Sequence, residues 1–511
     1  MLISLGRLAL ALASGGITFA SVKPLGWWPA GIVGIALLYV SFMPWRGRTI
    51  PTWYGAVFAF AHGFVLYLCT LPWIGELVGQ FPYIALAFWL SLYSLLLGIG
   101  GVAISRWRWG FLVFPFFYVA VELLRSSVPF GGFSWVRLAW GQIDGPLAYL
   151  APWGGPALIT FATVACAMGL VGTFAANSWR LRGAGLAAVV LPLVAGLLAE
   201  GGVNNPAKTE REVTVAAIQG NVPRTGLDFE GQRRAVLSNH VMETQRAARE
   251  GAQVDLVLWP ENSSDVNPFQ DAQARTLVDA AANAIKAPIL VGTLTEDAVG
   301  ERNTMQVFYP DSRVGEHHYK KYLQPFGETM PMRDFFRHLS SYVDYAGDFK
   351  PGDGPGVVDM AGIAVGVATC YEVSFDEAFR SSVRHGAGIL VSPTNNATFG
   401  YSDMTYQQLA MSRLRALETD RAVVVAATSG VSAIVQPDGS VSQQTEIFEP
   451  DHLIATLPVR EGETFAVRFG SLLQWLMAII GIVCAVIALR YNRLPRAPRK
   501  SKKTIEELST P

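Results

Sequence analysis

Eight long apolar segments constrain the fold of this chain more than any other feature of its 511 residues. Seven of the segments lie before residue 201, and the eighth lies near the C-terminal end. Most of them approach the roughly 20 residues that a helix needs to cross the hydrocarbon core of a bilayer. The sequence therefore predicts an α-helical transmembrane bundle of eight spans. The segments run approximately over 6–22, 26–43, 53–74, 83–105, 110–124, 155–178, 184–200 and 469–489.

The charged residues divide the chain into membrane and soluble parts. They make up only 16% of the sequence, against about 25% in a typical soluble protein, and most of the acidic ones lie between residues 202 and 467. We therefore expect a seven-span bundle over 1–201, a soluble domain over 202–467, an eighth transmembrane helix over 468–490 and a basic tail over 491–511. The formal net charge of +0 argues against nucleic acid as a partner, because phosphate binding needs a clustered excess of Lys and Arg.

Positive charge is concentrated in the loops on one side of the predicted bundle. Because short cytoplasmic loops carry an excess of Lys and Arg, this asymmetry places the N-terminus in the cytoplasm. An odd number of spans then puts residues 202–467 on the outer side of the membrane. The cytoplasmic residues would be Arg7, Arg46, Arg48, Arg106, Arg108, Arg180, Arg182 and the basic tail from Arg490 to Lys503.

Membrane spanning alone does not explain two features of the predicted bundle. Glu122 lies within an apolar segment, where a carboxylate is costly unless it is paired, and Arg125 follows on the same helical face. The simplest interpretation is an ion pair near the end of the helix. Residues 131–153 are rich in Gly, Trp and Pro. That composition favours an interfacial loop packed under the soluble domain over one that contacts lipid headgroups.

Residues 212–467 alternate between short buried strands and helices and end in a run of strands. This order is typical of a layered α/β sandwich, with the sheets inside and the helices outside. Helices are predicted near 231–250, 271–286 and 403–419, and Pro437-Asp438-Gly439 is predicted to turn a hairpin. The main predicted strands are 213–218, 256–259, 289–292, 305–309, 363–369, 389–392 and 422–427.

Three segments of the soluble domain carry reactive side chains near the ends of strands. Glu261 follows a buried strand, and Pro260 stops the hydrogen-bond ladder just before it. Lys320 and Glu328 flank a Pro-Phe-Gly turn, and Cys370 ends another buried strand. The carboxyl ends of strands are where α/β folds usually gather reactive groups, so we expect these side chains to meet.

Cys370 is the one cysteine outside the apolar segments, since Cys69, Cys166 and Cys484 all lie within them. It therefore has no disulfide partner in the soluble domain. Such a cysteine is either an apolar filler or a reactive group, and burial statistics alone favour the filler. Its place at a strand end, in a chain with Glu261 at a comparable strand end, favours a nucleophile instead.

A carboxylate, a lysine and a cysteine together support acyl transfer through a thioester. The carboxylate would take the thiol proton, and the ammonium would stabilise the thiolate and then the tetrahedral oxyanion. This chemistry needs no histidine, metal or cofactor, and none of the seven histidines has a convincing metal-ligand spacing with a second donor. The adjacent His317 and His318 are most simply explained as solvated turn residues.

The three segments resemble the nitrilase superfamily, whose members use a Glu-Lys-Cys triad on a four-layer α-β-β-α sandwich. The matching pieces are Trp259-Pro260-Glu261, Lys320 three residues before Leu323, and Cys370-Tyr371-Glu372. With the bundle in front and one span behind, the resemblance narrows to the apolipoprotein N-acyltransferase family and covers nearly the whole chain. Further similar pieces are Gln219-Gly220-Asn221-Val222-Pro223, Pro325-Phe326-Gly327-Glu328, Asn395-Asn396-Ala397-Thr398-Phe399-Gly400 and Arg413-Leu414-Arg415-Ala416-Leu417-Glu418.

The resemblance implies a role for each matching residue. Glu261 resembles the family's general base, Lys320 its oxyanion-stabilising lysine and Cys370 its acylated nucleophile. We prefer Lys320 to its neighbour Lys321 because of its spacing to Leu323 and Glu328. Thr398 stands where many relatives have Trp, so any contact made by that Trp is missing here. Substrate-binding or supporting roles are implied for Glu328, Tyr371, Glu372 and Asn396.

The resemblance also implies a two-step reaction at a bacterial inner membrane, with the catalytic domain on the periplasmic side. Cys370 would take an acyl chain from a phospholipid, typically phosphatidylethanolamine, and the α-amine of a diacylglyceryl-cysteine apolipoprotein would accept it. A site just above the bilayer reaches both substrates without moving their tails into water, which costs about 0.8 kcal/mol per CH₂. Met330, Met332, Phe335 and Phe336 could form a lip for these tails, although core packing is the simpler role for each.

Two other functions fit parts of this pattern. A membrane-tethered nitrilase-like amidase would use the same triad, because water and an amine attack the same thioester. The bundle argues against it, since a small soluble amide needs no eight-span platform. A transporter or scaffold with an inactive catalytic domain is disfavoured, because transporters usually show inverted repeats and mid-membrane charges, and Glu122 is the sole candidate for such a charge.

Overall fold

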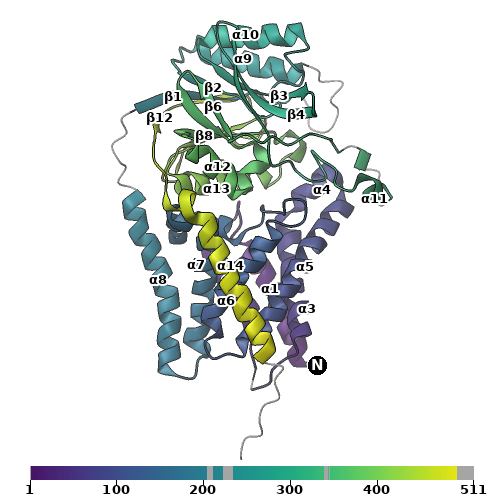
Figure 1. Ribbon diagram of the computed structural model, residues 1–511, viewed down its shortest axis with the longest axis vertical. Helices are drawn as coiled ribbons and strands as arrows, with labels where there is room; N and C mark the ends of the chain where they lie inside the picture. The colour runs from purple at the N-terminus through teal and green to yellow at the C-terminus, as the bar shows by residue number, and fades with distance from the viewer. Residues whose placement is uncertain are drawn as a thin grey trace, which may run out of the picture.

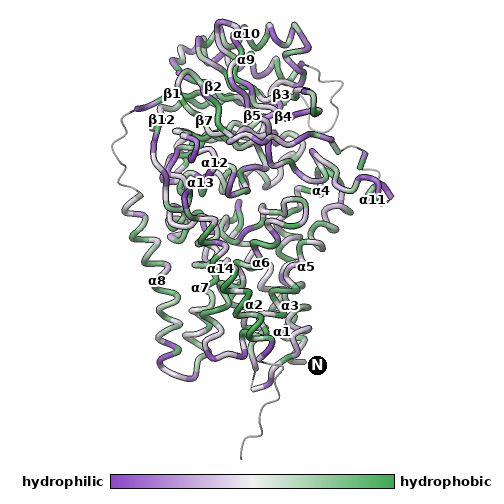
Figure 2. The backbone as a smooth tube through the Cα atoms, in the orientation of Figure 1, coloured by the Kyte–Doolittle hydropathy of each residue, from purple (hydrophilic) through white to green (hydrophobic). Residues whose placement is uncertain are grey.

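The two ends of the chain build a helical bundle, and the middle builds an α/β sandwich stacked on one end of that bundle (Figure 1). The computed structural model describes residues 2–45, 47–203, 211–222, 234–338, 343–344 and 346–491. Hydrophobic residues, coloured green, fill the bundle, while hydrophilic residues, coloured purple, are frequent in the sandwich (Figure 2). The division of the charged residues along the sequence is therefore also a division in space.

A helix forms at each of the eight predicted apolar segments. Among the described residues, five helical stretches are long and apolar enough to cross a membrane: Thr52–Thr70, Gln80–Ser105, Pro146–Ala175, Trp179–Gly202 and Phe465–Tyr491. α1 and α2 are apolar but shorter, and α6 has 16 residues. The helical bundle is confirmed, and its eight spans stay a prediction. The bundle helices are α1 (Leu2–Phe19), α2 (Trp28–Phe42), α3 (Thr52–Thr70), the short α4 (Pro72–Val78), α5 (Gln80–Ser105), α6 (Gly110–Arg125), α7 (Ala151–Ala175), α8 (Trp179–Val203) and α14 (Phe465–Tyr491).

Two six-stranded sheets form the centre of the sandwich. Their middle strands are parallel and almost wholly buried, as expected for runs of Val, Ile, Leu and Ala that are covered on both faces. The first sheet has the order β12-β1-β2-β3-β4-β5, with β1 (Arg211–Gln219), β2 (Leu256–Leu258), β3 (Ile289–Asp297), β4 (Gly300–Phe308), β5 (Val314–Tyr319) and β12 (Asp451–Val459). The second has the order β11-β10-β9-β8-β7-β6, with β6 (Val357–Met360), β7 (Ile363–Val367), β8 (Ile389–Thr394), β9 (Val423–Ala427), β10 (Ala433–Val435) and β11 (Val441–Gln444).

Helices cover the outer face of each sheet and complete four layers. α9 (Ala235–Arg249) and α10 (Ala272–Ile285) pack on the first sheet, away from the bundle. α12 (Asp376–Arg384) and α13 (Met404–Thr419) pack on the second sheet and face the bundle. Apolar side chains from both sheets interdigitate between them. The predicted α-β-β-α sandwich is therefore confirmed, and the membrane bundle adds a fifth layer.

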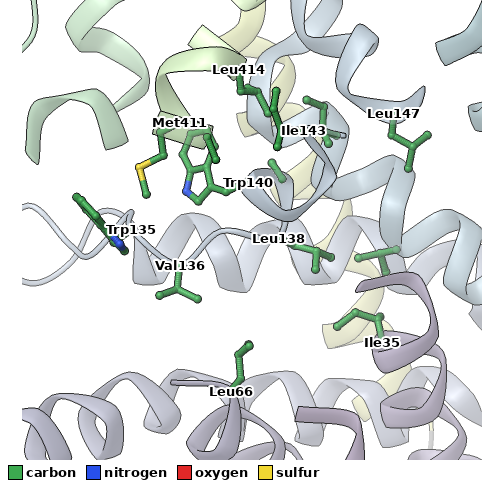
Figure 3. Close-up of a cluster of buried hydrophobic side chains, with 14 of the residues drawn as sticks. Ile35, Leu66, Trp135, Val136, Leu138, Trp140, Ile143, Leu147, Met411 and Leu414 are labelled. Atoms are coloured by element: carbon green, nitrogen blue, oxygen red, sulfur yellow. The ribbon is translucent and has the colours of Figure 1, made fainter. Parts of the chain in front are cut away.

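The contact between sandwich and bundle is an extension of the hydrophobic core. In α13, 14 of the 16 residues are buried, although an outer helix of a sandwich normally keeps one wet face. Its cover is the loop between α6 and α7, which carries the short helices η1 (Leu138–Gln142) and η2 (Pro146–Leu150). Trp140 from this loop lies against Met411 and Leu414 of α13 (Figure 3). The prediction of a loop packed under the soluble domain is confirmed.

Glu122 is paired with Arg125 as predicted, and it also contacts other residues. The distance from its Oε2 to Nη2 of Arg125 is 3.8 Å, whereas Oε1 lies 3.4 Å from Nε of Arg137. The hydroxyl of Thr160 in α7 also donates to Oε1 at 2.8 Å. Arg137 then reaches out of the bundle to Asp376 at the start of α12, at 2.7 Å. The carboxylate therefore begins an ionic path from α6 into the sandwich.

The path continues between α12 and α13. Asp376 also accepts a hydrogen bond from Arg415 at 2.9 Å, and Arg415 contacts Glu418 at 2.5 Å. Glu418 in turn binds Arg380 through two hydrogen bonds of 2.8 and 2.6 Å. The Nε–H of Arg415 donates a hydrogen bond to the carbonyl oxygen of Val373 at 2.9 Å. We call Glu122, Arg137, Asp376, Arg380, Arg415 and Glu418 the interface network.

Candidate active site

Glu261 lies just past the end of β2, at the edge where the parallel strands of the first sheet finish. It comes very close to β3, because a Cβ at Gly292 would lie 2.2 Å from the carbonyl oxygen of Pro260. Only glycine allows this approach. The backbone N–H of Asn395, from the end of β8 in the other sheet, donates to Oε2 of Glu261 at 3.1 Å. The side chain is buried and points between the two sheets' ends.

Lys320 follows β5 and brings the second charge into contact with Glu261. Its Nζ lies 2.8 Å from Oε1 of Glu261 and 2.9 Å from Oε1 of Glu328. Burial alone would lower the pKa of Lys320, but these two carboxylates outweigh burial and raise the pKa well above its ordinary value. The neighbouring Lys321 is exposed. Lys320, chosen over Lys321 from its spacing, is thus the lysine that the fold brings to the two carboxylates.

Glu328 closes the Pro-Phe-Gly turn and shares the ammonium. Its Oε2 accepts the backbone N–H of Gln324 at 2.8 Å, which fixes the carboxylate to its own turn. Burial raises the pKa of Glu328, and the nearby charge of Glu261 adds to that effect, while Lys320 acts against it. One ammonium therefore serves two acids, and the proton affinity of Glu328 remains raised.

Asn303 of β4 is a member of this group that the sequence did not indicate. Its Nδ2 donates to Oε1 of Glu261 at 2.7 Å and to Oε1 of Glu328 at 2.8 Å. It thereby bridges the same two oxygens as Lys320. Its Oδ1 is buried and has no hydrogen-bond partner among the described residues. Its neighbours Arg302 and Thr304 are polar as well, so no local sequence signal marks Asn303 as a site residue.

Cys370 begins a tight turn, η5 (Cys370–Ser374), directly after β7. Its φ of 51° lies in the left-handed region, which a residue with a Cβ adopts at a cost. The side chain is 6% exposed. Burial, together with the negative charge of Glu261, raises the pKa of Cys370 to about 12, while Lys320 and a hydrogen bond with Thr394 act to lower it. The thiol is thus packed in the core but within the electrostatic reach of both predicted partners.

Glu372 ties the cysteine turn to the lysine segment. Its Oε2 accepts the backbone N–H of Thr369 at 2.7 Å, and its Oε1 accepts that of Tyr322 at 3.0 Å. His318 approaches Oε2 at 3.3 Å. The interpretation of His318 as a solvated turn residue is wrong, because the residue lies in β5 and is 5% exposed. His317, in contrast, is exposed.

Tyr371 and Asn396 face away from the carboxylates. The ring of Tyr371 stacks on Trp135 of the bundle loop, with centroids 6.2 Å apart and planes 12° apart. Asn396 donates to Sδ of Met404 and Oε1 of Gln408, both in α13, at 3.2 and 3.3 Å. Tyr371 therefore contacts the loop between α6 and α7, and Asn396 contacts α13, the helix that lies between the second sheet and the bundle.

Apolar side chains project beside the site on the segment that carries α11 (Arg333–Arg337). Met332 is 60% and Phe335 57% exposed, and Met330 and Phe336 are half-buried. Core packing is therefore wrong as a role for Met332 and Phe335. Phe336 makes an edge-to-face contact with Phe326 of the Pro-Phe-Gly turn, with centroids 5.0 Å apart. These residues form an exposed apolar rim, which we call the α11 rim.

This arrangement can hold a thiol proton, a negative oxygen and an acyl chain at one place. A carboxylate can accept a proton and is oriented here by several donors, a buried ammonium offsets an oxyanion, and the rim offers apolar contact. Among the described residues, no group of three or more His, Cys, Asp or Glu side chains has the geometry to hold a metal ion.

Known families match both parts of the molecule. Residues 14–169 match the family "Apolipoprotein N-acyltransferase N-terminal domain", and residues 214–466 match the family "Carbon-nitrogen hydrolase". An apolipoprotein N-acyltransferase from Mycolicibacterium smegmatis is 42% identical over 97% of this chain and 88% of its own length. One from Photobacterium profundum is 27% identical over 95% of this chain and 96% of its own length. The solved structure of Saccharomyces cerevisiae Nit3, a member of branch 10 of the nitrilase superfamily, is 19% identical and covers 52% of this chain and 97% of its own, with a TM-score of 0.37.

The fold and these matches define a membrane protein in which a helical bundle carries a carbon-nitrogen hydrolase domain of the nitrilase superfamily. Within that class, the chain belongs to the apolipoprotein N-acyltransferase family. It is an enzyme, an acyltransferase.

Proposed function

We propose that the enzyme moves a fatty acyl chain from a phospholipid to the N-terminal α-amine of a lipoprotein, through a thioester on Cys370. Glu261 is the general base and Lys320 stabilises the oxyanion. One observation carries the assignment: the ammonium of Lys320 is buried 2.8 Å from Glu261 and its charge acts on the Cys370 thiol. A buried thiol beside a carboxylate and an ammonium is the set of groups that acyl transfer needs.

In the first step, the sulfur attacks the ester carbonyl carbon of the phospholipid. Because the pKa of Cys370 is about 12, the resting thiol keeps its proton, and Glu261 takes it as the S–C bond forms. The carbonyl oxygen becomes an oxyanion, which Lys320 stabilises. The C–O bond then breaks, the leaving alkoxide takes the proton back from Glu261, and a lysophospholipid departs.

In the second step, an amine takes the place of the leaving lysophospholipid. The α-amine nitrogen attacks the thioester carbonyl carbon and forms a second oxyanion beside Lys320. Glu261 takes a proton from the nitrogen, the C–S bond breaks, and the proton passes to the sulfur. The products are an amide and the free thiol, so the cycle closes without a cofactor.

The acyl donor is a glycerophospholipid, and phosphatidylethanolamine is the donor we expect. The acceptor is the diacylglyceryl-modified cysteine at the N-terminus of an apolipoprotein. The M. smegmatis and P. profundum relatives are both named as acyltransferases of apolipoproteins, which supports a lipoprotein acceptor. The exposed α11 rim supports lipid substrates, because Met332 and Phe335 offer apolar surface to acyl chains at the edge of the site.

The membrane placement that fits this reaction has eight spans, with the catalytic domain on the periplasmic side of a bacterial inner membrane. The N-terminal end of α1 and the C-terminal end of α14 lie at the end of the bundle away from the sandwich (Figure 1). Arg106 and Arg180 follow the ends of α5 and α7 on the sequence, which supports a cytoplasmic position for these connections.

A hydrolytic amidase is the second candidate, because water can attack the same thioester. The tight joint between α13 and the bundle argues against it, since a small soluble amide gains nothing from a site built against membrane helices.

The test is intact mass spectrometry of the purified full-length enzyme after incubation with phosphatidylethanolamine vesicles. We expect a mass gain of one acyl group that hydroxylamine removes and that Cys370→Ala abolishes. A diacylglyceryl lipopeptide should discharge it as an amide. An enzyme that never gains an acyl mass, or gains it equally with Cys370→Ala, would refute the proposal. Hydrolysis of a small amide without acylation by lipid would favour the amidase.

A further inference from the structure

Two adjacent histidines in β5 have different surroundings. His317 is exposed, whereas His318 is 5% exposed and lies against the site. Side chains alternate between the two faces of a strand, so His318 shares its face with Lys320, two residues on. No step of the proposed reaction uses His318. A buried titratable side chain on the same strand face as the oxyanion-stabilising lysine requires an explanation.

The direct contact of His318 is the carboxylate of Glu372. Nε2 of the ring lies 3.3 Å from Oε2 of Glu372. Burial acts to raise the pKa of Glu372, but the hydrogen bond from His318 and those from backbone N–H groups outweigh burial and lower that pKa. The carboxylate is therefore ionised at neutral pH, and an ionised carboxylate only accepts hydrogen bonds. It follows that Nε2 of His318 carries a proton and donates it.

Glu372 links the two segments that bear the reacting groups. It accepts the backbone N–H of Thr369, the residue before Cys370, at 2.7 Å. It also accepts the backbone N–H of Tyr322, which follows the lysine segment, at 3.0 Å. One carboxylate therefore joins the segment just before the thiol to the segment just after the ammonium. Among the described residues, His318 is the side chain that holds this carboxylate from β5.

We propose that His318 is a positioning residue for acyl transfer: its Nε2–H orients Glu372, and Glu372 keeps the Cys370 turn in register with Lys320. The proposal rests on the proposed roles of Cys370 and Lys320. Because His318 contacts neither reacting group, its loss should slow the chemical step and leave phospholipid binding unchanged. A misplacement of about 1 Å at a reacting group costs on the order of 10²-fold in rate.

Two amide variants that differ by one methylene test this role. The amide N–H₂ of Gln reaches about as far from the backbone as the ring Nε2, whereas that of Asn falls short of Glu372. We would measure steady-state acyl transfer to a diacylglyceryl lipopeptide by the full-length enzyme, with phosphatidylethanolamine varied in mixed micelles to separate kcat from KM. His317→Asn is the matched control, since it makes the same change one residue earlier, on the exposed face.

We expect His318→Asn to lower kcat by about tenfold to a hundredfold with KM within twofold, and His318→Gln to restore kcat to within about threefold. If His318→Asn does not fold, His318→Met fills the same space without a donor and should show the same loss. Two results would overturn the proposal: an unchanged kcat in both His318→Asn and His318→Met, or equal losses with Gln and Asn. Cys370→Ala is run in parallel. Acylation that survives in Cys370→Ala sinks the proposed function, whereas a dead Cys370→Ala beside a fully active His318→Asn sinks only the role of His318.

Discussion

Two buried clusters of charged side chains meet the turn from Cys370 to Ser374, one through the thiol and the other through carbonyl groups. The first consists of Glu261, Lys320 and Glu328, with a single cation between two acids. The second is the interface network, in which Arg415 binds the carbonyls of Val373 and Ser374 at 2.9 and 3.1 Å. Most side chains of both clusters are buried, and the most exposed, Glu328 and Asp376, are only 14% and 11% exposed, so burial alone does not distinguish the proposed reactive cluster from the structural one.

Proton affinity does distinguish them. In the interface network, burial would raise the pKa of Asp376, but Arg137, Arg380 and Arg415 outweigh it and lower that pKa far below the ordinary range. The pKa of Arg380 is raised, so the network is locked in its charged form. In the site, the pKa values of Cys370 and Glu328 are both raised, while the raised pKa of Lys320 keeps the ammonium charged. A site with two acids and a thiol around one cation therefore holds its acidic protons more tightly than a network rich in arginine.

Removing the site's ammonium should give the largest effect on rate. We expect Lys320→Met to slow thioester formation by about 10³-fold, because the oxyanion then develops beside two uncompensated carboxylates. Lys321→Met is the matched control, since its side chain is exposed. Thioester formation is measured by single-turnover mass spectrometry. Equal losses in the two variants would remove the distinction between the lysines.

Removing a cation from the interface network should instead act on stability. Arg415→Met leaves Glu418 and Asp376 each without one buried partner, and we expect a loss of about 3 kcal/mol in the free energy of unfolding. Arg246→Met in α9 is the control, because its pair with Glu250 is half exposed and should contribute far less to stability. Denaturant unfolding in mixed micelles measures both. A network variant as stable as the control would show that its charges are not a structural joint.

The central strands, the layer order and the three reactive segments could be predicted because each is a local pattern. Apolar runs such as 256–259 and 389–392 predict buried strands, and Glu261 and Cys370 lie where such runs end. The edge strand β5 lacks such a run, since five of its six residues are exposed or half-buried and only His318 is buried. For that reason His318 was mistaken for a turn residue.

The interface network could not be predicted for a different reason. Arg137 and Asp376 are 239 residues apart, and nothing local marks either as the other's partner. The pair Glu122 and Arg125 is predictable because both residues lie within one helix turn. Arg137, which is not predictable in this way, makes the shorter contact with the Glu122 carboxylate. Pairings across layers need the fold, whereas pairings within an element do not.

Asn303 lies between the two kinds of cluster, because it is uncharged yet contacts both acids of the site. Asn303→Ala removes its two hydrogen bonds to Glu261 and Glu328, and bonds to charged groups contribute about 1.5–3 kcal/mol. We expect acylation slower by about tenfold to thirtyfold, with Lys320 still in place. The measurement is the same single-turnover assay. A rate within threefold of the native enzyme would mean that the ammonium alone fixes both carboxylates.

The pH dependence of thiol alkylation tests the comparison in the resting enzyme, without substrate. Iodoacetamide reacts with the thiolate, and a thiol whose pKa is about 12 gains thiolate tenfold per pH unit up to that pH. We therefore expect the alkylation rate of Cys370, followed by peptide mass spectrometry, to rise about a hundredfold from pH 7 to pH 9 without levelling off. Glu261→Gln removes a charge that raises this pKa, so alkylation at a given pH should become faster. A plateau below pH 9 would mean that the ammonium of Lys320 already holds a thiolate, and the site would then be locked in its charged form like the network beneath it.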